Sequence, residues 1–250
     1  MPIIELGMNP VPIDIDLHTL NISDQYLKNS LLGKNITMLF VTNALGFMPD
    51  YSIIQKICRE RNILLIEDNC ESLGSESYYV KSGNAGFAST FSFYVAHHLS
   101  TIEGGMVCTD NKQLYNMLRI VRANGWDRNL DDANKEEIRK QYNINKFYSK
   151  YTFYDLGYNL RPTEITGFLG LKQLRYVTKI IKNRELNYNL ISAKIKNNND
   201  IMPIDIRYMA TISSFCLPFV FKTRELKEKY IEKFNKAGIE TRPIIAGDIT

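Results

Sequence analysis

The stretch that decides the fold is residues 36–68, which read ITMLFVTNALGFMPDYSIIQKICRERNILLIED. Two apolar runs of strand length, Ile36 to Val41 and Ile63 to Ile66, flank a segment from Asp50 to Glu60. That segment carries three isoleucines at a spacing that predicts one apolar helical face, namely Ile53, Ile54 and Ile57. Strand, helix and strand in this order predict an α/β architecture with parallel strand pairing.

The same alternation continues outward along the chain. Two more apolar runs predict strands over Ala88 to Tyr94 and Met106 to Cys108. After Asp110 the pattern predicts helices over Gln113–Ala123, Asn134–Tyr142, Pro162–Leu174 and Val177–Lys196. Toward the N-terminus we expect a strand over Val11–Ile15. Toward the C-terminus we expect a strand over Ser213–Phe221, a helix over Thr223–Lys236 closed by Gly238, and a strand through Thr241. We therefore predict a large α/β domain over residues 1–175 and a smaller α+β unit over 176–250.

Composition excludes several classes of function. The 250 residues are 44% hydrophobic and 23% charged, which is typical of a globular chain. The net charge is only +4, and basic residues alternate with acidic ones, so nucleic-acid binding is not indicated. No apolar run reaches the length of a membrane span, and no signal peptide is visible, so we expect a cytoplasmic protein without a membrane contact. The four cysteines are scattered, which predicts neither disulfides nor a metal site.

The second strand of the opening stretch ends in an acidic pair, Glu67-Asp68. Ligands of open α/β sheets bind at the carboxyl ends of the strands, where Asp68 would point into the crevice. A carboxylate in this position can equally cap the following loop. From these residues alone both interpretations stay open.

A histidine pair follows the next predicted strand. Residues 91–105 read FSFYVAHHLSTIEGG and hold two of the three histidines, His97 and His98. A single histidine in a loop is more often structural, but two histidines after a strand, downstream of a strand-end aspartate, favour an active site. Metal ligation is less attractive, because adjacent residues on an extended segment point to opposite faces.

Taken together, these residues resemble a known family. Glu67-Asp68, Ser92, Glu103-Gly104-Gly105, the run Gly157-Tyr158-Asn159-Leu160-Arg161 and the following helix with Glu164 and Gly167 resemble the sugar aminotransferases called DegT/DnrJ/EryC1/StrS. The resemblance implies a fold-type I, vitamin B6-dependent enzyme with a large, mixed, mostly parallel sheet and a smaller C-terminal domain. It covers the middle and part of the C-terminal region of a typical member. We therefore expect the fold to be incomplete at both ends, without the family's N-terminal phosphate-binding turn.

The resemblance also implies roles for individual residues. Asp68 would pair with the pyridine nitrogen of pyridoxal phosphate, Ser92 would bind the cofactor phosphate, and Asn159 would bind it from a neighbouring subunit. A homodimer with shared active sites follows from the last role. Glu71 would also contact the cofactor, while His98 and Arg242 would contact the substrate.

The departure from the family pattern is His97, which stands where aminotransferases carry a lysine that holds the cofactor covalently. No lysine lies between Lys81 and Lys112, and an imidazole cannot form that bond. With Glu71, this histidine resembles the lysine-lacking branch of sugar 3-dehydratases. In that branch pyridoxamine phosphate condenses with a nucleotide-linked keto sugar, histidine acts as base, and glutamate restores the cofactor. A related subtype uses an iron–sulfur cluster, but residues 122–128 contain no cysteine, so we expect no cluster.

The sequence therefore favours a nucleotide-sugar 3-dehydratase that acts on a 4-keto-6-deoxy hexose. Two alternatives stay open. One is an aminotransferase that tolerates the missing lysine, and the other is an inactive homologue that keeps only a scaffold role.

Overall fold

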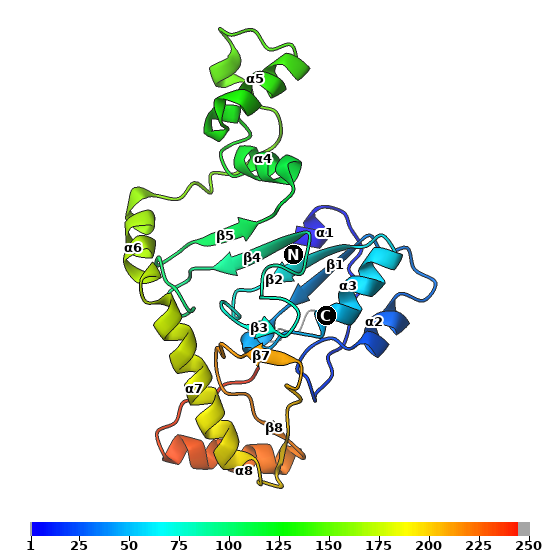
Figure 1. Cartoon of the computed structure of the whole chain (residues 1–250), viewed down its shortest axis with the longest axis vertical. Coiled ribbons are helices and arrows are strands. Elements are labelled where there is room, and N and C mark those ends of the chain that lie inside the picture. Colours follow the sequence, from blue (N-terminus) through cyan, green and yellow to red (C-terminus); the bar gives the residue numbers. More distant parts are fainter. Residues whose placement is uncertain (1, 245–250) are drawn as a thin grey trace.

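The computed structural model describes residues 2–244 and is built around a four-stranded sheet (Figure 1). Its strands are β1 (Met38–Thr42), β2 (Leu64–Asp68), β4 (Ala88–Ser92) and β5 (Gly105–Cys108), in the spatial order β1-β2-β4-β5. The pairs β1·β2 and β2·β4 are parallel, whereas β5 pairs antiparallel with β4. The predicted mixed, mainly parallel α/β sheet is thereby confirmed.

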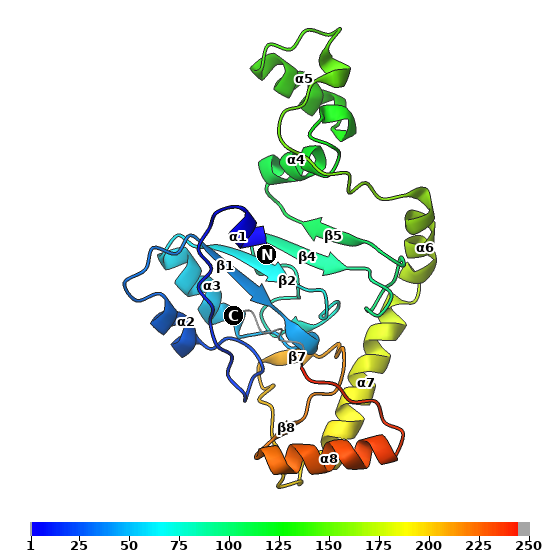
Figure 2. The ribbon, with the colours of Figure 1, turned by 180° about the vertical axis from the view of Figure 1, so that it is seen from behind.

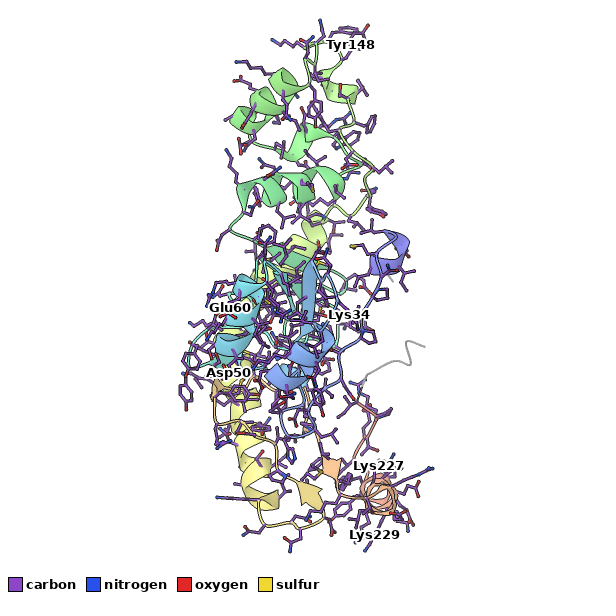
Figure 3. The ribbon with its side chains drawn as sticks, turned by 90° about the vertical axis from the view of Figure 1, so that its right-hand side faces the viewer. Lys34, Asp50, Glu60, Tyr148, Lys227 and Lys229 are labelled. Atoms are coloured by element: carbon purple, nitrogen blue, oxygen red, sulfur yellow. The ribbon has the colours of Figure 1, made fainter. Side chains whose placement is uncertain are left out.

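Helix α3 (Tyr51–Glu60) connects β1 to β2 and covers one face of the sheet (Figure 3). It begins at the N-cap Asp50, whose carboxylate accepts the amide of Ser52 at 3.0 Å. Ile54 and Ile57 are buried in the same hydrophobic cluster as the inward side chains of β1 and β2. Ile53 lies at the edge of this face, where it is 38% exposed and lines a hollow together with Ile57.

The opposite face of the sheet is open. Along β1 and β2 burial alternates, so that Leu39, Val41 and Leu65 are buried while Phe40 and Leu64 are 48% and 49% exposed. This period of two is that of a sheet packed on one side. At the carboxyl ends of the strands, side chains on one face therefore pack beneath α3, and side chains on the other face are accessible.

Helices α4 (Lys112–Val121) and α5 (Asp132–Gln141) project from the β5 end of the sheet (Figure 1). The chain then returns past its own outgoing segment, where Asn124 donates to the carbonyl of Tyr158 at 2.8 Å. At this crossing a Cβ on Gly157 would collide with the backbone of Gly125. The glycine of the Gly157-Tyr158-Asn159 motif is thus required by the close approach of two backbones.

Helices α6 (Glu164–Leu174) and α7 (Val177–Ile195) run along one side of the molecule, and α8 (Arg224–Lys236) crosses below (Figure 2). We expected Pro162 in the first turn of α6, but the helix begins after Thr163, which forms a capping box with Thr166. The molecule is elongated, with Tyr148 at one tip and Lys229 near the other (Figure 3).

The C-terminal part contributes three short strands, β6 (Ile201–Met202), β7 (Met209–Thr211) and β8 (Val220–Phe221). Strands β6 and β8 pair with each other, whereas β7 pairs antiparallel with β3 (Glu76–Ser77) of the N-terminal part. The main hydrophobic cluster also joins Tyr188, Met209 and Ile212 to the β1–α3–β2 unit. The division into residues 1–175 and 176–250 stays a prediction, and the two parts share one core.

Several expected elements differ from the structure. Residues 11–15 form no strand, because Pro10 and Pro12 remove backbone donors that a ladder needs. Within Ser213–Phe221 only β8 is a strand, and residues 239–241 form none. Two short helices were not predicted, α1 (Pro2–Glu5) and α2 (Asp24–Ser30). Among the described residues, no helix is both long and apolar enough to span a bilayer. The cytoplasmic location stays a prediction.

Candidate active site

The acidic pair at the end of β2 has two different environments. Glu67 is fully buried, and its carboxylate accepts three backbone amides, from Gly83 at 2.9 Å, Ala85 at 2.6 Å and Gly86 at 2.8 Å. Asp68 points to the opposite face and is partly exposed. Its Oδ1 accepts the amide of Cys70 at 3.0 Å, which fixes the orientation of the carboxylate. Glu67 is therefore a structural anchor, and Asp68 is the residue available to a ligand.

Asp68 belongs to a row of polar side chains across the sheet. The register pairs Thr42 with Asp68 and Asp68 with Thr90, so these three residues share the open face. Ser92 lies two residues beyond Thr90 on β4 and therefore points to the same face. The structure thus places the predicted pyridine partner and the predicted phosphate partner on one face, at the carboxyl ends of neighbouring strands.

Beyond Ser92 the chain forms a compact connection to β5. Ser92 Oγ accepts the amide of Tyr94 at 3.2 Å, and the amide of His97 donates to the carbonyl of Tyr94 at 3.0 Å. On the α6 side, the amide group of Gln173 bonds both the N–H and the C=O of Ser100, at 3.0 and 2.8 Å. This pair of bonds fixes the backbone of the histidine loop, which we define as residues 93–104.

The ring of His97 lies between two aromatic rings. The ring centroid of Tyr94 is 5.8 Å away and that of Phe215 is 5.4 Å away, with interplanar angles of 78° and 83°. Within the described part of the chain, Nδ1 of His97 is buried and has no hydrogen-bond partner. The ring is thus oriented by aromatic contacts there and not by a hydrogen bond to Nδ1.

His98 faces the interior. It is 4% exposed, and its Nε2 lies 2.9 Å from the carbonyl oxygen of Ser213. A carbonyl can only accept, so Nε2 carries the proton of the neutral ring. The structure therefore gives His98 a partner inside the chain, and its predicted contact with substrate stays a prediction.

Burial lowers the pKa of His98 from its ordinary value of 6.5 to about 4. Between these two values the unfolded chain binds a proton at this ring that the folded chain does not, so the free energy of unfolding falls as the pH falls. Between pH 7 and pH 5 we expect His98 to account for about 2 kcal/mol of that loss. Urea titrations at pH 7 and pH 5 measure it. In a His98→Gln variant, which keeps a donor for Ser213, the difference between the two pH values should shrink; an unchanged difference would contradict the assignment.

Glu71 holds the turn that follows β1. Its Oε2 accepts the amide of Leu45 at 2.7 Å, and Leu45 has a positive φ of 58°. The next residue, Gly46, has φ +93°, and a Cβ there would lie 2.6 Å from the carbonyl oxygen of Ser213. The predicted contact of Glu71 with the cofactor stays a prediction, and the structure adds a positioning role for its carboxylate.

A buried polar network lies beneath the site, and the sequence did not predict it. Asn43 is fully buried, donates to Asn69 at 2.7 Å and accepts the hydroxyl of Tyr51 at 2.9 Å. Ser72 donates to Asn69 at 2.9 Å. Because Asn69 directly follows Asp68, this network positions the carboxyl end of β2. The only sequence signal was a cluster of small polar residues after each strand.

The two remaining predicted residues lie apart from this group. Asn159 is exposed, and its side chain accepts from Arg161 at 2.9 Å. Arg242 is exposed near the end of the described chain, where its charge acts on the thiol of Cys216. Among the described residues, neither bonds to Asp68, Ser92 or His97. Their roles toward cofactor and substrate stay predictions.

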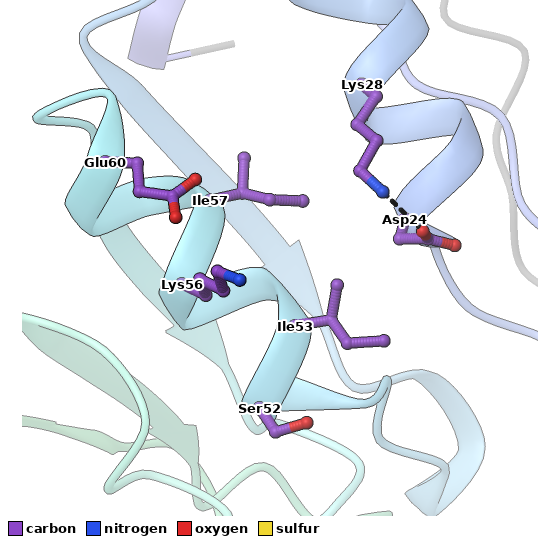
Figure 4. Close-up of a pocket in the computed structure, with 7 residues that line it drawn as sticks. All are labelled: Asp24, Lys28, Ser52, Ile53, Lys56, Ile57 and Glu60. Carbon is purple, nitrogen blue, oxygen red and sulfur yellow. Dashed lines mark hydrogen bonds and ion pairs between the residues drawn. The ribbon is translucent and has the colours of Figure 1, made fainter.

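One surface hollow lies away from these residues. It is an open, charged hollow between α2 and α3, beside the Lys28–Asp24 ion pair of 2.8 Å (Figure 4). None of the predicted site residues lines it.

The thiol of Cys70 lies near Asp68. Burial and the neighbouring Asp68 carboxylate raise the pKa of this thiol to about 12. Cys70 therefore stays protonated and is no nucleophile at neutral pH.

Comparison with known proteins identifies relatives in sequence and in fold. The chain is 35% identical over 250 residues to GDP-4-keto-6-deoxy-D-mannose 3-dehydratase of Escherichia coli O55:H7, covering 99% of this chain and 63% of that protein. A solved structure of GDP-4-keto-6-deoxymannose-3-dehydratase, a histidine-to-asparagine mutant with bound GDP-perosamine, superposes with a TM-score of 0.84 at 30% identity. Another, with a trapped PLP-glutamate geminal diamine, has a TM-score of 0.85 at 30% identity. In both, the match covers 99% of this chain and 63% of the other.

The model of the DegT/DnrJ/EryC1/StrS aminotransferase family matches residues 1–247, nearly the whole chain. The solved structures named above share the fold of the chain. The chain therefore belongs to the DegT/DnrJ/EryC1/StrS aminotransferase family.

Proposed function

We propose that the protein is a pyridoxamine phosphate-dependent nucleotide-sugar 3-dehydratase acting on a 4-keto-6-deoxy hexose. The observation that carries the proposal is His97, which lies in the loop after β4 where the family's aminotransferases carry lysine. No lysine occurs between Lys81 and Lys112. The relatives described above support the proposal, since one holds GDP-perosamine and another a PLP-glutamate adduct.

The residues present fit a pyridoxal or pyridoxamine phosphate. Asp68 offers an oriented, partly exposed carboxylate, which would keep a pyridine nitrogen protonated. Ser92 offers a hydroxyl on the same face. When bound, the cofactor supplies an electron sink that makes the C–H bond beside its amine acidic and lets a neighbouring hydroxyl depart.

In this proposal His97 moves the proton. Nδ1 is buried, so Nε2 is the nitrogen that would accept a proton from the carbon attached to the cofactor's amine. The imidazole, which can both accept and donate a proton, would then return that proton to the departing hydroxyl of the sugar. A lysine at the same place would carry a primary amine that can condense with the aldehyde of the cofactor, and an imidazole has no such amine.

A homodimer with shared active sites completes the proposal. The segment around Asn159 exposes large apolar side chains, with Leu156 91%, Tyr158 64% and Leu160 68% exposed. The neighbouring helix α6 adds Leu171, which is 73% exposed. Apolar side chains so exposed on adjacent segments are typical of an interface between subunits. Asn159 would then reach the cofactor of the partner subunit.

Product analysis tests the function. The purified chain is incubated with pyridoxal phosphate, glutamate and GDP-4-keto-6-deoxymannose, and ammonia and the sugar product are measured. We expect ammonia in equimolar amount with a 3-deoxy keto sugar, because water hydrolyses the imine of the eliminated product to a ketone and ammonia. Borohydride should attach no cofactor to the protein, whereas a lysine-containing aminotransferase of the family serves as the positive control. An amino sugar product, or cofactor reduced onto a lysine, would contradict the dehydratase.

A further inference from the structure

A segment of the C-terminal part reaches the histidine loop. Residues 213–215, which we call the 213–215 segment, place the ring of Phe215 against both histidines. The centroid of this ring is 5.4 Å from that of His97 and 6.2 Å from that of His98. Because Tyr94 lies at 5.8 Å with its own edge-on contact, His97 has one aromatic neighbour from its own loop and one from 118 positions later in the sequence.

The backbone of the 213–215 segment is held at several points. Nη1 of Arg184, on α7, donates to the carbonyls of Ser214 and Phe215 at 2.9 and 3.1 Å. The amide of Phe215 donates to the carbonyl of Leu45 at 2.9 Å. The amide of Ser213 donates to Ser75 Oγ at 3.1 Å, so elements from both halves of the chain fix the segment.

These contacts join the turn after β1 to the histidine. The carboxylate of Glu71 holds the amide of Leu45, and the carbonyl of Leu45 holds the amide of Phe215. The ring of Phe215 in turn contacts His97. A base that must reach one carbon atom needs a fixed ring orientation, and here rigid packing supplies what a hydrogen bond to the second nitrogen supplies in many other enzymes.

We propose that Phe215 is a positioning residue for His97, held in place by Arg184 and by the Glu71–Leu45 contact. The proposal rests on the proposed function for its kinetic consequence, but the orientation of the ring can be measured without turnover. The sequence did not predict this contact, because the pattern of residues 213–221 indicates a strand.

The test uses the full chain with ¹³C-labelled histidine. The chain has three histidines, so the imidazole signals of His18, His97 and His98 can be assigned by single substitutions. In Phe215→Leu we expect the His97 ring to lose its nuclear Overhauser contacts with the Tyr94 ring, because a ring that is free to turn leaves the edge-on contact, and we expect His18 to stay unchanged. Phe219→Leu is the matched control, since Phe219 packs against Phe221 and Phe234 instead.

Kinetics give the second readout. Phe215→Leu should lower kcat roughly tenfold with KM changed by less than about twofold, since a misplaced base weakens the transition state and not substrate binding. Phe215→Tyr, which keeps the ring, should recover most of the loss. If Phe215→Leu does not fold, the same measurements are made on Arg184→Lys. This variant weakens the hydrogen bonds to the carbonyls of Ser214 and Phe215.

The two proposals fail separately. A wild-type chain that releases no ammonia overturns the proposed function, while the histidine spectra still decide the positioning role. An active wild type whose Phe215→Leu variant keeps the His97–Tyr94 contacts and an unchanged kcat overturns the positioning role alone.

Discussion

Replacing His97 with asparagine is expected to abolish elimination while the cofactor stays bound. Asparagine cannot accept a proton at neutral pH, so the loss should equal the contribution of a general base, roughly 10²- to 10⁴-fold in kcat. Binding should persist, because the expected cofactor contacts come from Asp68 and Ser92. Ammonia release at saturating substrate measures the first effect, and the absorbance of protein-bound cofactor after gel filtration measures the second.

The matched control is His18→Asn. His18 is exposed and lies outside the site, so this variant should keep full activity. The unfolding midpoint of His97→Asn should stay close to that of the wild type, because within the described residues the His97 ring makes aromatic contacts and no hydrogen bond. Retained turnover in His97→Asn would remove this residue from the catalytic role.

Removing the Glu67 side chain is expected to destabilise the fold more than any other single change considered. Glu67→Ala would leave the amides of Gly83, Ala85 and Gly86 without their acceptor in a fully buried place. At about 1 kcal/mol or more for each unsatisfied donor, the free energy of unfolding should fall by about 3 to 5 kcal/mol. Urea denaturation followed by circular dichroism measures it.

The neighbouring residue provides the control. Asp68→Ala removes one acceptor, for the Cys70 amide, on the partly exposed face. This variant should lose only about 1 kcal/mol but should bind pyridoxal phosphate more weakly. Glu67→Gln, which keeps one acceptor oxygen, should lie between wild type and Glu67→Ala. Equal destabilisation by Glu67→Ala and Asp68→Ala would contradict the division of roles between the two carboxylates.

Much of the fold could be predicted because local signals and long-range packing agreed. The apolar runs of residues 36–68 became β1 and β2, and the isoleucine spacing between them became α3. Helix α8 was bounded by an N-cap threonine at Thr223 and by Gly238, which has φ +72°. These elements carry their own start and stop residues, so short-range chemistry was sufficient.

The strand predicted at residues 213–215 is absent because the backbone of this segment bonds to distant parts of the chain. Residues 213–215 were read as the start of a strand, yet their backbone groups bond to Arg184, Leu45 and Ser75 instead of a ladder. All these partners are at least 29 residues away in sequence, so a local sequence pattern cannot predict these contacts.

The sequence by itself determined the α/β order of elements, the family resemblance and the absence of a lysine at the position of His97, because these properties reside in residue types and their spacing. Only the tertiary structure decided which carboxylate of Glu67-Asp68 is an anchor and which is open to a ligand, since strand register assigns each to a face. It also decided that His98 turns inward to Ser213 while His97 stays between Tyr94 and Phe215. Two adjacent histidines are chemically identical in a sequence, and they acquire different roles only when distant segments pack around them.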